Sequence, residues 1–139
     1  TSLAKERGIN ITETKSPKEG EFVTLVQLEI NTDKESRRIA GTLSANKQPR
    51  IVKIDDYYVE SSPVGEMLFI RNRDVPGIIG GLGSLMGQYN INIAAMSFGR
   101  QTAGGTALSV LNVDSVLTPE VLEKVRKIEN VLYAKVIKI

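Results

Sequence analysis

Residues 66–96 read EMLFIRNRDVPGIIGGLGSLMGQYNINIAAM, and this stretch decides the fold. Its first part contains the apolar run 67–70, which predicts a buried strand. After a Pro-Gly turn, five apolar residues recur at the spacing of one helix face: Ile78, Leu82, Leu85, Met86 and Tyr89. Asn90 ends this helix, and residues 91–96 predict a second strand. The stretch therefore predicts a strand–helix–strand unit.

The sequence beyond residue 96 completes a six-element pattern. Residues 101–105 predict a hairpin turn, and a third strand follows over 106–113. Residues 118–120 read Thr-Pro-Glu, which predicts a helix start because they offer a capping hydroxyl, a proline at the first helical position and an early acid. A strand over 131–139 closes the chain. The order βαββαβ predicts a ferredoxin-like α+β unit, with two helices on one face of a four-stranded antiparallel sheet.

The residues before this unit predict a mainly antiparallel sheet preceded by the end of a helix, 2–7, that Gly8 terminates. Short strand-like segments alternate with turns over 9–14, 22–30, 38–43, 50–54 and 57–60. The Ser-Ser-Pro-Val-Gly stretch at 61–65 marks a boundary, so we divide the chain into 1–64 and 65–139. Because the helical pattern starts without an initiator Met, we expect a piece of something longer.

Composition narrows the possible chemistry. The chain has 139 residues, no apolar run near the ~20 residues that span a bilayer, and a 41% hydrophobic fraction typical of globular proteins. With neither Cys nor His it has no Ser-His-Asp triad and no His- or Cys-ligated metal, and we expect no metal site. A net charge of +2 with 5% aromatic residues gives poor support for nucleic-acid binding. The lack of Cys favours a cytoplasmic location.

Two groups of residues remain as candidate binding sites, and the first is the strand-to-helix junction. Residues 72–77 read Asn-Arg-Asp-Val-Pro-Gly, and Asn92 begins the next strand. Main-chain amides at a helix start can receive a carboxylate, and an Asn or Asp side chain can receive an ammonium or hydroxyl group. This combination suits a free amino acid. The alternative is that Asp74 only caps the helix.

The second group is cationic and consists of Lys47, Arg50 and Lys53. Together they could bind an anion, although a solvated strand edge explains the same charges. In a regular strand the side chains of Arg50 and Lys53 would point to opposite faces, so at most one of them would lie beside Lys47.

Residues 66–139 resemble an ACT domain, the small-molecule-sensing module of amino-acid metabolism. The resemblance rests on residues 72–78, on residues 90–96 and on the βαββαβ order. The hairpin strands over 98–114 are similar to the corresponding part of the D-3-phosphoglycerate dehydrogenase family.

The first part of the chain is similar to the same family. Residues 4–9, 39–43 and 49–55 resemble the allosteric substrate-binding (ASB) domain, which precedes the ACT domain in the long form of these enzymes. The resemblance implies a partial ASB domain over 1–64 and an ACT domain over 65–139. It also implies that the catalytic domains lie outside this chain.

The resemblance implies a function and a set of site residues. The parent would oxidise 3-phosphoglycerate with NAD in serine biosynthesis, while this chain would hold no cofactor. L-Serine or another small amino acid would bind where ACT domains meet, at Asn72, Asp74, Val75, Pro76, Gly77, Ile78 and Asn92. Arg50, with Lys47 and Lys53 as alternates, would bind phosphate or a phosphorylated substrate.

This chain differs from serine-sensing members of the family at some site residues, and the sequence also allows two other interpretations. Some serine-sensing members have His and Asn where this chain has Asn72 and Asp74, and many have Arg in place of Val75. The small subunit of iron-sulfur L-serine dehydratase is a second possible host, and a ligand-free dimerisation module is a third reading. We expect self-association through the open sheet edges and the helix that carries Gly80, Gly81, Gly83 and Gly87. A ligand bound where two ACT domains meet would restrain a hinge near residues 61–65.

Overall fold

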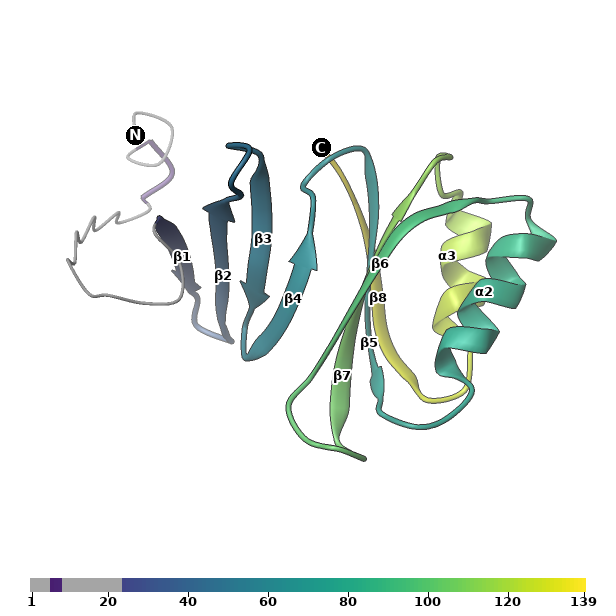
Figure 1. Ribbon diagram of the computed structural model, residues 1–139. Helices are drawn as coiled ribbons and strands as arrows, with labels where there is room; N and C mark the ends of the chain where they lie inside the picture. Colours follow the sequence, from purple (N-terminus) through teal and green to yellow (C-terminus); the bar gives the residue numbers. More distant parts are fainter. Residues whose placement is uncertain (1–5, 9–23) are drawn as a thin grey trace.

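The computed structural model describes residues 6–8 and 24–139, and they form two four-stranded sheets with two helices (Figure 1). The strand expected over 9–14 and most of the helix expected over 2–7 lie outside the described residues. Among the described residues no helix is long and apolar enough to cross a bilayer.

The first sheet is an antiparallel meander in the order β1-β2-β3-β4. Its strands are β1 (Leu25–Asn31), β2 (Ser36–Leu43), β3 (Pro49–Ile54) and β4 (Tyr57–Ser61). The turn between β1 and β2 is closed by Thr32, whose hydroxyl accepts hydrogen bonds from the amides of Lys34 and Glu35. Four of the expected strands are therefore present, with ends shifted by at most three residues.

The second sheet has the order β6-β7-β5-β8, and both helices lie on one of its faces (Figure 1). Its elements are β5 (Glu66–Arg73), α2 (Ile78–Gln88), β6 (Ile93–Arg100), β7 (Thr106–Val113), α3 (Pro119–Arg126) and β8 (Val131–Lys138). This arrangement confirms the predicted ferredoxin-like α+β order. Strand β6, which was expected over 91–96, runs to residue 100, four residues beyond its expected end.

Short local signals fix the ends of the helices. The Thr118 hydroxyl accepts a hydrogen bond from the Val121 amide and Pro119 opens α3, as the sequence predicts. Asn90 and Asn130 adopt left-handed conformations, with φ of 53° and 68°, and each leads the chain into the next strand.

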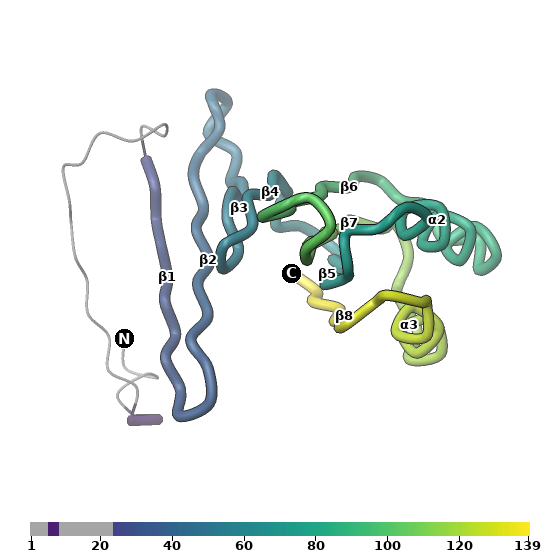
Figure 2. Tube along the Cα trace, turned by 90° about the horizontal axis from the view of Figure 1, so that it is seen from below, coloured from purple at the N-terminus to yellow at the C-terminus, as the bar shows by residue number. Residues whose placement is uncertain are grey.

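The second sheet is covered by the helices on one face and by part of the first sheet on the other. On one face Leu68, Ile70 and Leu111 pack against the helices, in a core that also contains Leu82 and Val125. On the other face a second cluster joins the two sheets, with Ile51, Tyr57 and Val59 from the first sheet and Met67, Leu108 and Val110 from the second. Strand β4 consequently lies beside β6, while β1 lies far from the second sheet (Figure 2).

The connection between the sheets is held in place by Asn112 on β7. The Asn112 amide nitrogen donates to the carbonyls of Ser62 and Val64 at 3.0 and 3.1 Å, and its oxygen accepts from the Ser61 hydroxyl at 3.0 Å. Both Ser61 and Asn112 are buried. Residues 61–65 are therefore a fixed connection, which corrects the expectation of a hinge there.

Candidate functional site

The predicted amino-acid site lies at the turn between β5 and α2, where Asp74 binds the β6–β7 hairpin. Its Oδ2 accepts hydrogen bonds from Arg100 Nη1 and from the Gly104 amide, each at 3.3 Å. Its own amide donates to the Gly105 carbonyl at 2.9 Å. The Asp74 side chain is 15% exposed. Its carboxylate is thus held at the surface by a neighbouring hairpin.

Asp74 does not cap helix α2, although the sequence left this alternative open. Its N-cap is Gly77, with φ of 95°, and no side chain of the described residues caps it. The reading in which Asp74 only caps this helix is therefore wrong. A glycine suits this position because a left-handed φ carries no steric cost without a Cβ.

The open start of α2 can receive a negative charge. The Gly81 amide donates to the Gly77 carbonyl, so the amides of residues 78–80 precede the first helical hydrogen bond. The first turn of α2 carries no acidic residue. Unpaired amides and the helix dipole together favour a carboxylate at this end.

Asn72 lies beneath the turn rather than on the surface. Its side chain is fully buried, its Nδ2 donates to the Arg73 carbonyl at 2.7 Å, and its Oδ1 accepts from the Ser109 hydroxyl at 3.4 Å. In this structure Asn72 therefore holds the backbone that carries Asp74. A direct contact between Asn72 and a ligand stays a prediction.

Asn92 lies at the other end of the second sheet. Its Nδ2 donates to Asp114 Oδ2 at 2.5 Å, and the Asp114 amide donates back to the Asn92 carbonyl at 3.1 Å. Arg100, which contacts Asp74, ends β6, whereas Asn92 comes directly before its start. At about 3.3 Å per residue, the chain between them spans about 26 Å. Only a second copy could place Asn92 beside the Asp74 turn.

Sequence reasoning missed three partners of these residues: Arg100 and Gly104, which bind Asp74, and Asp114, which binds Asn92. The hairpin sequence contained a signal, because a glycine pair marks a tight turn that can approach another loop. It did not show which loop the hairpin would approach.

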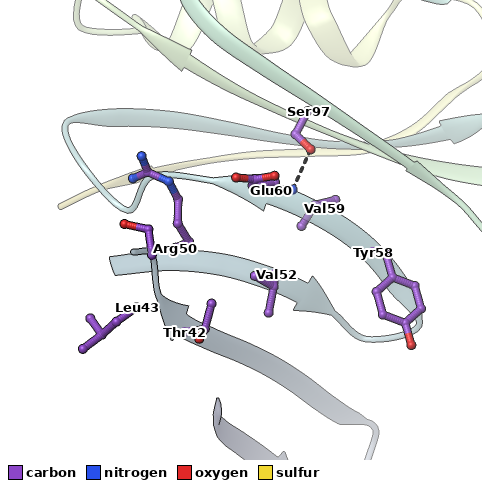
Figure 3. A pocket seen from close by; sticks show the side chains of 9 residues that line it. Thr42, Leu43, Arg50, Val52, Tyr58, Val59, Glu60 and Ser97 are labelled. Atoms are coloured by element: carbon purple, nitrogen blue, oxygen red, sulfur yellow. Dashed lines mark hydrogen bonds between the residues drawn. The ribbon is translucent and has the colours of Figure 1, made fainter. Parts of the chain in front are cut away.

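The cationic group lies beside a cavity of about 460 Å³ on the first sheet (Figure 3). Arg50 Nη1 donates to the Ser62 hydroxyl at 2.5 Å and to the Pro49 carbonyl at 3.2 Å. The Glu60 amide donates to the Ser97 hydroxyl at 2.8 Å, the contact marked in Figure 3. The lining residues are Thr42, Leu43, Ser44, Arg50, Val52, Tyr58, Val59, Glu60 and Ser97.

A β-bulge changes the placement of Arg50 and Lys53. The pairing of β3 with β2 shifts between Lys53 and Ile51, which pair with the consecutive residues Ala40 and Gly41, so β3 carries one extra residue there. Ile51 and Ile54 consequently both pack toward the second sheet. Arg50 lines the cavity, and Lys53 Nζ lies 4.9 Å from the ring centroid of Tyr58, which lines the same cavity. The expectation of opposite faces assumed a regular strand and is wrong, because the bulge adds a residue between them.

Lys47 lies outside this cavity. It sits in the turn between β2 and β3 with φ of 59°, and its amide donates to the Ser44 carbonyl. Of the three predicted cations, the structure brings Arg50 and Lys53 to the cavity region and leaves Lys47 exposed in the turn.

Two protein families match the chain. Residues 1–55 match the D-3-phosphoglycerate dehydrogenase intervening domain, and residues 67–130 match the ACT domain. The fold, the turn at the start of α2 and these matches together define a regulatory region that ends in an ACT domain.

The relatives specify the family more closely. The chain is 35% identical to a D-3-phosphoglycerate dehydrogenase of Synechocystis sp. over 98% of its length, 36% to that of Methanocaldococcus jannaschii over 93%, and 39% to that of Archaeoglobus fulgidus over 95%. It covers 24%, 24% and 25% of these proteins. The chain is homologous to D-3-phosphoglycerate dehydrogenases and corresponds to their regulatory part. It spans about a quarter of the length of the curated relatives it matches.

Proposed function

We propose that this chain is the regulatory region of a cytoplasmic, NAD-dependent D-3-phosphoglycerate dehydrogenase, and that L-serine binds where two ACT domains meet. The observation that carries the proposal is the Asp74 turn, which combines a surface carboxylate with open amides at the start of α2. The curated relatives named above support the choice of dehydrogenase over dehydratase as the parent.

The chemistry of the turn suggests how serine would lie. Its carboxylate would accept hydrogen bonds from the amides of residues 78–80, while Val75 and Pro76 would bound the site. Its ammonium group would face Asp74, whose Oδ1 has no partner among the described residues. Its hydroxyl would reach Asn92 of a second copy, since within one copy Asn92 lies about 26 Å along the strand from Arg100, the partner of Asp74.

Self-association would follow from the exposed surface of α2. A Cβ added at Gly80, Gly83 or Gly87 would meet nothing within 4 Å, so these positions are open. A Cβ added at Gly81, by contrast, would lie 3.6 Å from Ile128 Cγ2, in the region after α3. A second copy could therefore approach α2 closely.

Because Asn112 fixes residues 61–65, serine would move both sheets as one body relative to the catalytic domains.

The test is calorimetric titration of the chain with L-serine. Replacing Asp74 by Ala should weaken binding at least about tenfold, because a charge-assisted hydrogen bond is lost. Asn92→Ala should weaken it as well and reduce serine-induced dimerisation in sedimentation. Asp33→Ala, in an exposed turn of the first sheet, is the matched control. Equal affinity in all variants, or no heat at millimolar serine, would leave a ligand-free dimerisation module.

We propose a second role for Arg50, the binding of an anionic group such as phosphate. The specific observation is that Arg50 lines the cavity of about 460 Å³ and has only neutral hydrogen-bond acceptors among the described residues. Phosphate titration of Arg50→Ala should show weaker binding than the wild type, with Lys34→Ala, in an exposed turn, as the control. Unchanged phosphate affinity in Arg50→Ala would contradict this role.

A further inference from the structure

The Arg50 cavity contains two opposite charges that do not neutralise each other. Arg50 and Glu60 both line it, and no ion pair joins them among the described residues. Arg50 donates only to the neutral oxygens of Pro49, Ser62 and Gln48. The Glu60 carboxylate accepts no hydrogen bond from the described residues, while its amide is held by Ser97. Figure 3 shows both side chains along the same cavity wall.

This charge arrangement discriminates between ligands. A phosphate dianion gains from Arg50 but is repelled by the Glu60 carboxylate. A small zwitterion can place its carboxylate at Arg50 and its ammonium at Glu60, so that both charges are matched. An α-amino acid has these two groups on one carbon.

The rest of the cavity indicates the side chain of the ligand. Three of its hydroxyls take part in hydrogen bonds: Thr42 donates to the Thr24 carbonyl, Ser44 accepts from the Gln48 amide, and Ser97 accepts from the Glu60 amide. Its remaining lining is mainly apolar, from Leu43, Val52, Val59 and the ring of Tyr58. An aliphatic side chain fits this wall better than a hydroxymethyl group, because it removes more apolar surface from water against these four residues.

We propose that this cavity binds an α-amino acid with an aliphatic side chain, as a zwitterion held between Arg50 and Glu60. The inference rests on the proposed binding of an anionic group by Arg50, and it names the ligand class for that site. It is separate from the Asp74 turn, so the two amino-acid sites would differ in position and in preferred side chain.

The experiment is calorimetric titration of the 139-residue chain with L-leucine, L-serine and inorganic phosphate. Leucine should bind to the wild type, and both Arg50→Gln and Glu60→Gln should weaken it at least about tenfold. Glu60→Gln should leave phosphate binding unchanged or strengthen it, because a repelling charge is removed. Glu129→Gln, an exposed glutamate outside the cavity, is the matched control, and circular dichroism should show that all variants remain folded.

Each outcome separates the claims. If Arg50→Gln weakens phosphate while Glu60→Gln leaves leucine binding unchanged or strengthens it, Arg50 binds anions and the zwitterion site is wrong. If Arg50→Gln changes neither ligand, both claims for this cavity fail. No leucine heat at 10 mM, on the order of the weakest specific binding expected, overturns the inference. Asp74→Ala should leave leucine binding intact, so failure of the serine site remains distinguishable.

Discussion

Strands β7 and β1 are both rich in β-branched and aliphatic residues, yet their environments are opposite. In β7 seven of the eight residues are buried, and in β1 all seven residues are exposed. Strand β7 lies inside its sheet, with helices on one face and β4 on the other, while β1 is the edge strand of its sheet among the described residues. The difference shows that neighbouring elements, rather than strand composition, decide how much of a strand is buried.

The exposed apolar residues of β1 face an open space. Leu28 and Ile30 line a cavity of about 470 Å³ that also reaches Phe69, Tyr133 and Ile137 on the second sheet. The two sheets therefore meet closely at β4 and diverge toward β1. The cluster around Val59 and Val110 closes one end of the space between them, and the other end stays open.

The largest expected effect comes from the same substitution made in the two strands. Leu111→Ala in β7 removes a side chain with no exposed surface, and it should lower the free energy of unfolding by about 2–5 kcal/mol. Leu28→Ala in β1 truncates a residue that is 55% exposed, and it should lower the free energy of unfolding by less than about 1 kcal/mol. Urea denaturation of both variants measures the comparison. Similar losses would mean that β1 is covered in solution.

The sequence predicted the second sheet better than the first, for physical reasons. Periodicity located α2, Thr118 located α3, and the apolar strands followed, because in this region local signals and tertiary packing agree. In the first sheet the bulge at Ile51–Lys53 could not be anticipated, since a shift in register depends on a neighbouring strand.

The sequence predicted which turn could bind a ligand, but it did not predict the hydrogen bonds that hold this turn. The Asp74-Val75-Pro76-Gly77 segment identified a loop able to bind a ligand. The hydrogen bonds from Arg100 and Gly104 join residues about 30 positions apart, and no local pattern encodes them. Burial of Asn72 follows from its position on the helix-covered face of β5, which depends on the side on which the helices pack.

The next prediction tests whether the two regions unfold as one unit. Asn112→Ala removes three hydrogen bonds to residues 61–64 and should lower the free energy of unfolding by about 3 kcal/mol. Hydrogen exchange should rise in the first sheet more than in the helices, because the connection between the sheets loosens. Asn46→Ala, in the exposed turn between β2 and β3, is the control. An even rise over both regions would contradict a local role for Asn112.

A smaller effect should come from a pair of glycines that differ in their surroundings. A Cβ at Gly99 would overlap the Tyr58 carbonyl, so Gly99→Ala should cost about 1–3 kcal/mol where β4 meets β6. A Cβ at Gly83 meets nothing within 4 Å, so Gly83→Ala should stabilise α2 by roughly 0.5–1 kcal/mol. Thermal unfolding checks both signs. Destabilisation by Gly83→Ala at high protein concentration alone would indicate that a second copy occupies the α2 surface.

The smallest expected effect is a pH dependence confined to the helical layer. The hydrogen bond from the Tyr89 hydroxyl to the Glu120 carboxylate, 2.8 Å long, raises the pKa of Tyr89 above its ordinary value of about 10. Because the pKa is higher in the folded state, the protonated hydroxyl stabilises the fold fully below about pH 10. This contribution disappears as the pH rises through the raised pKa.

Tyr89→Phe should therefore be slightly less stable than the wild type at pH 8, and the difference should vanish or reverse in strongly alkaline solution. Urea midpoints measured for both proteins across this range provide the test, since every other group is common to both and its contribution cancels in the difference. In a Glu120→Ala background the Tyr89→Phe difference should lose most of its pH dependence, because the acceptor of the tyrosine hydrogen bond is gone. A difference between wild type and Tyr89→Phe that stays constant with pH would contradict the prediction. In that case the Tyr89–Glu120 contact does not hold α2 and α3 together in solution, and the apolar core alone stabilises the helical layer.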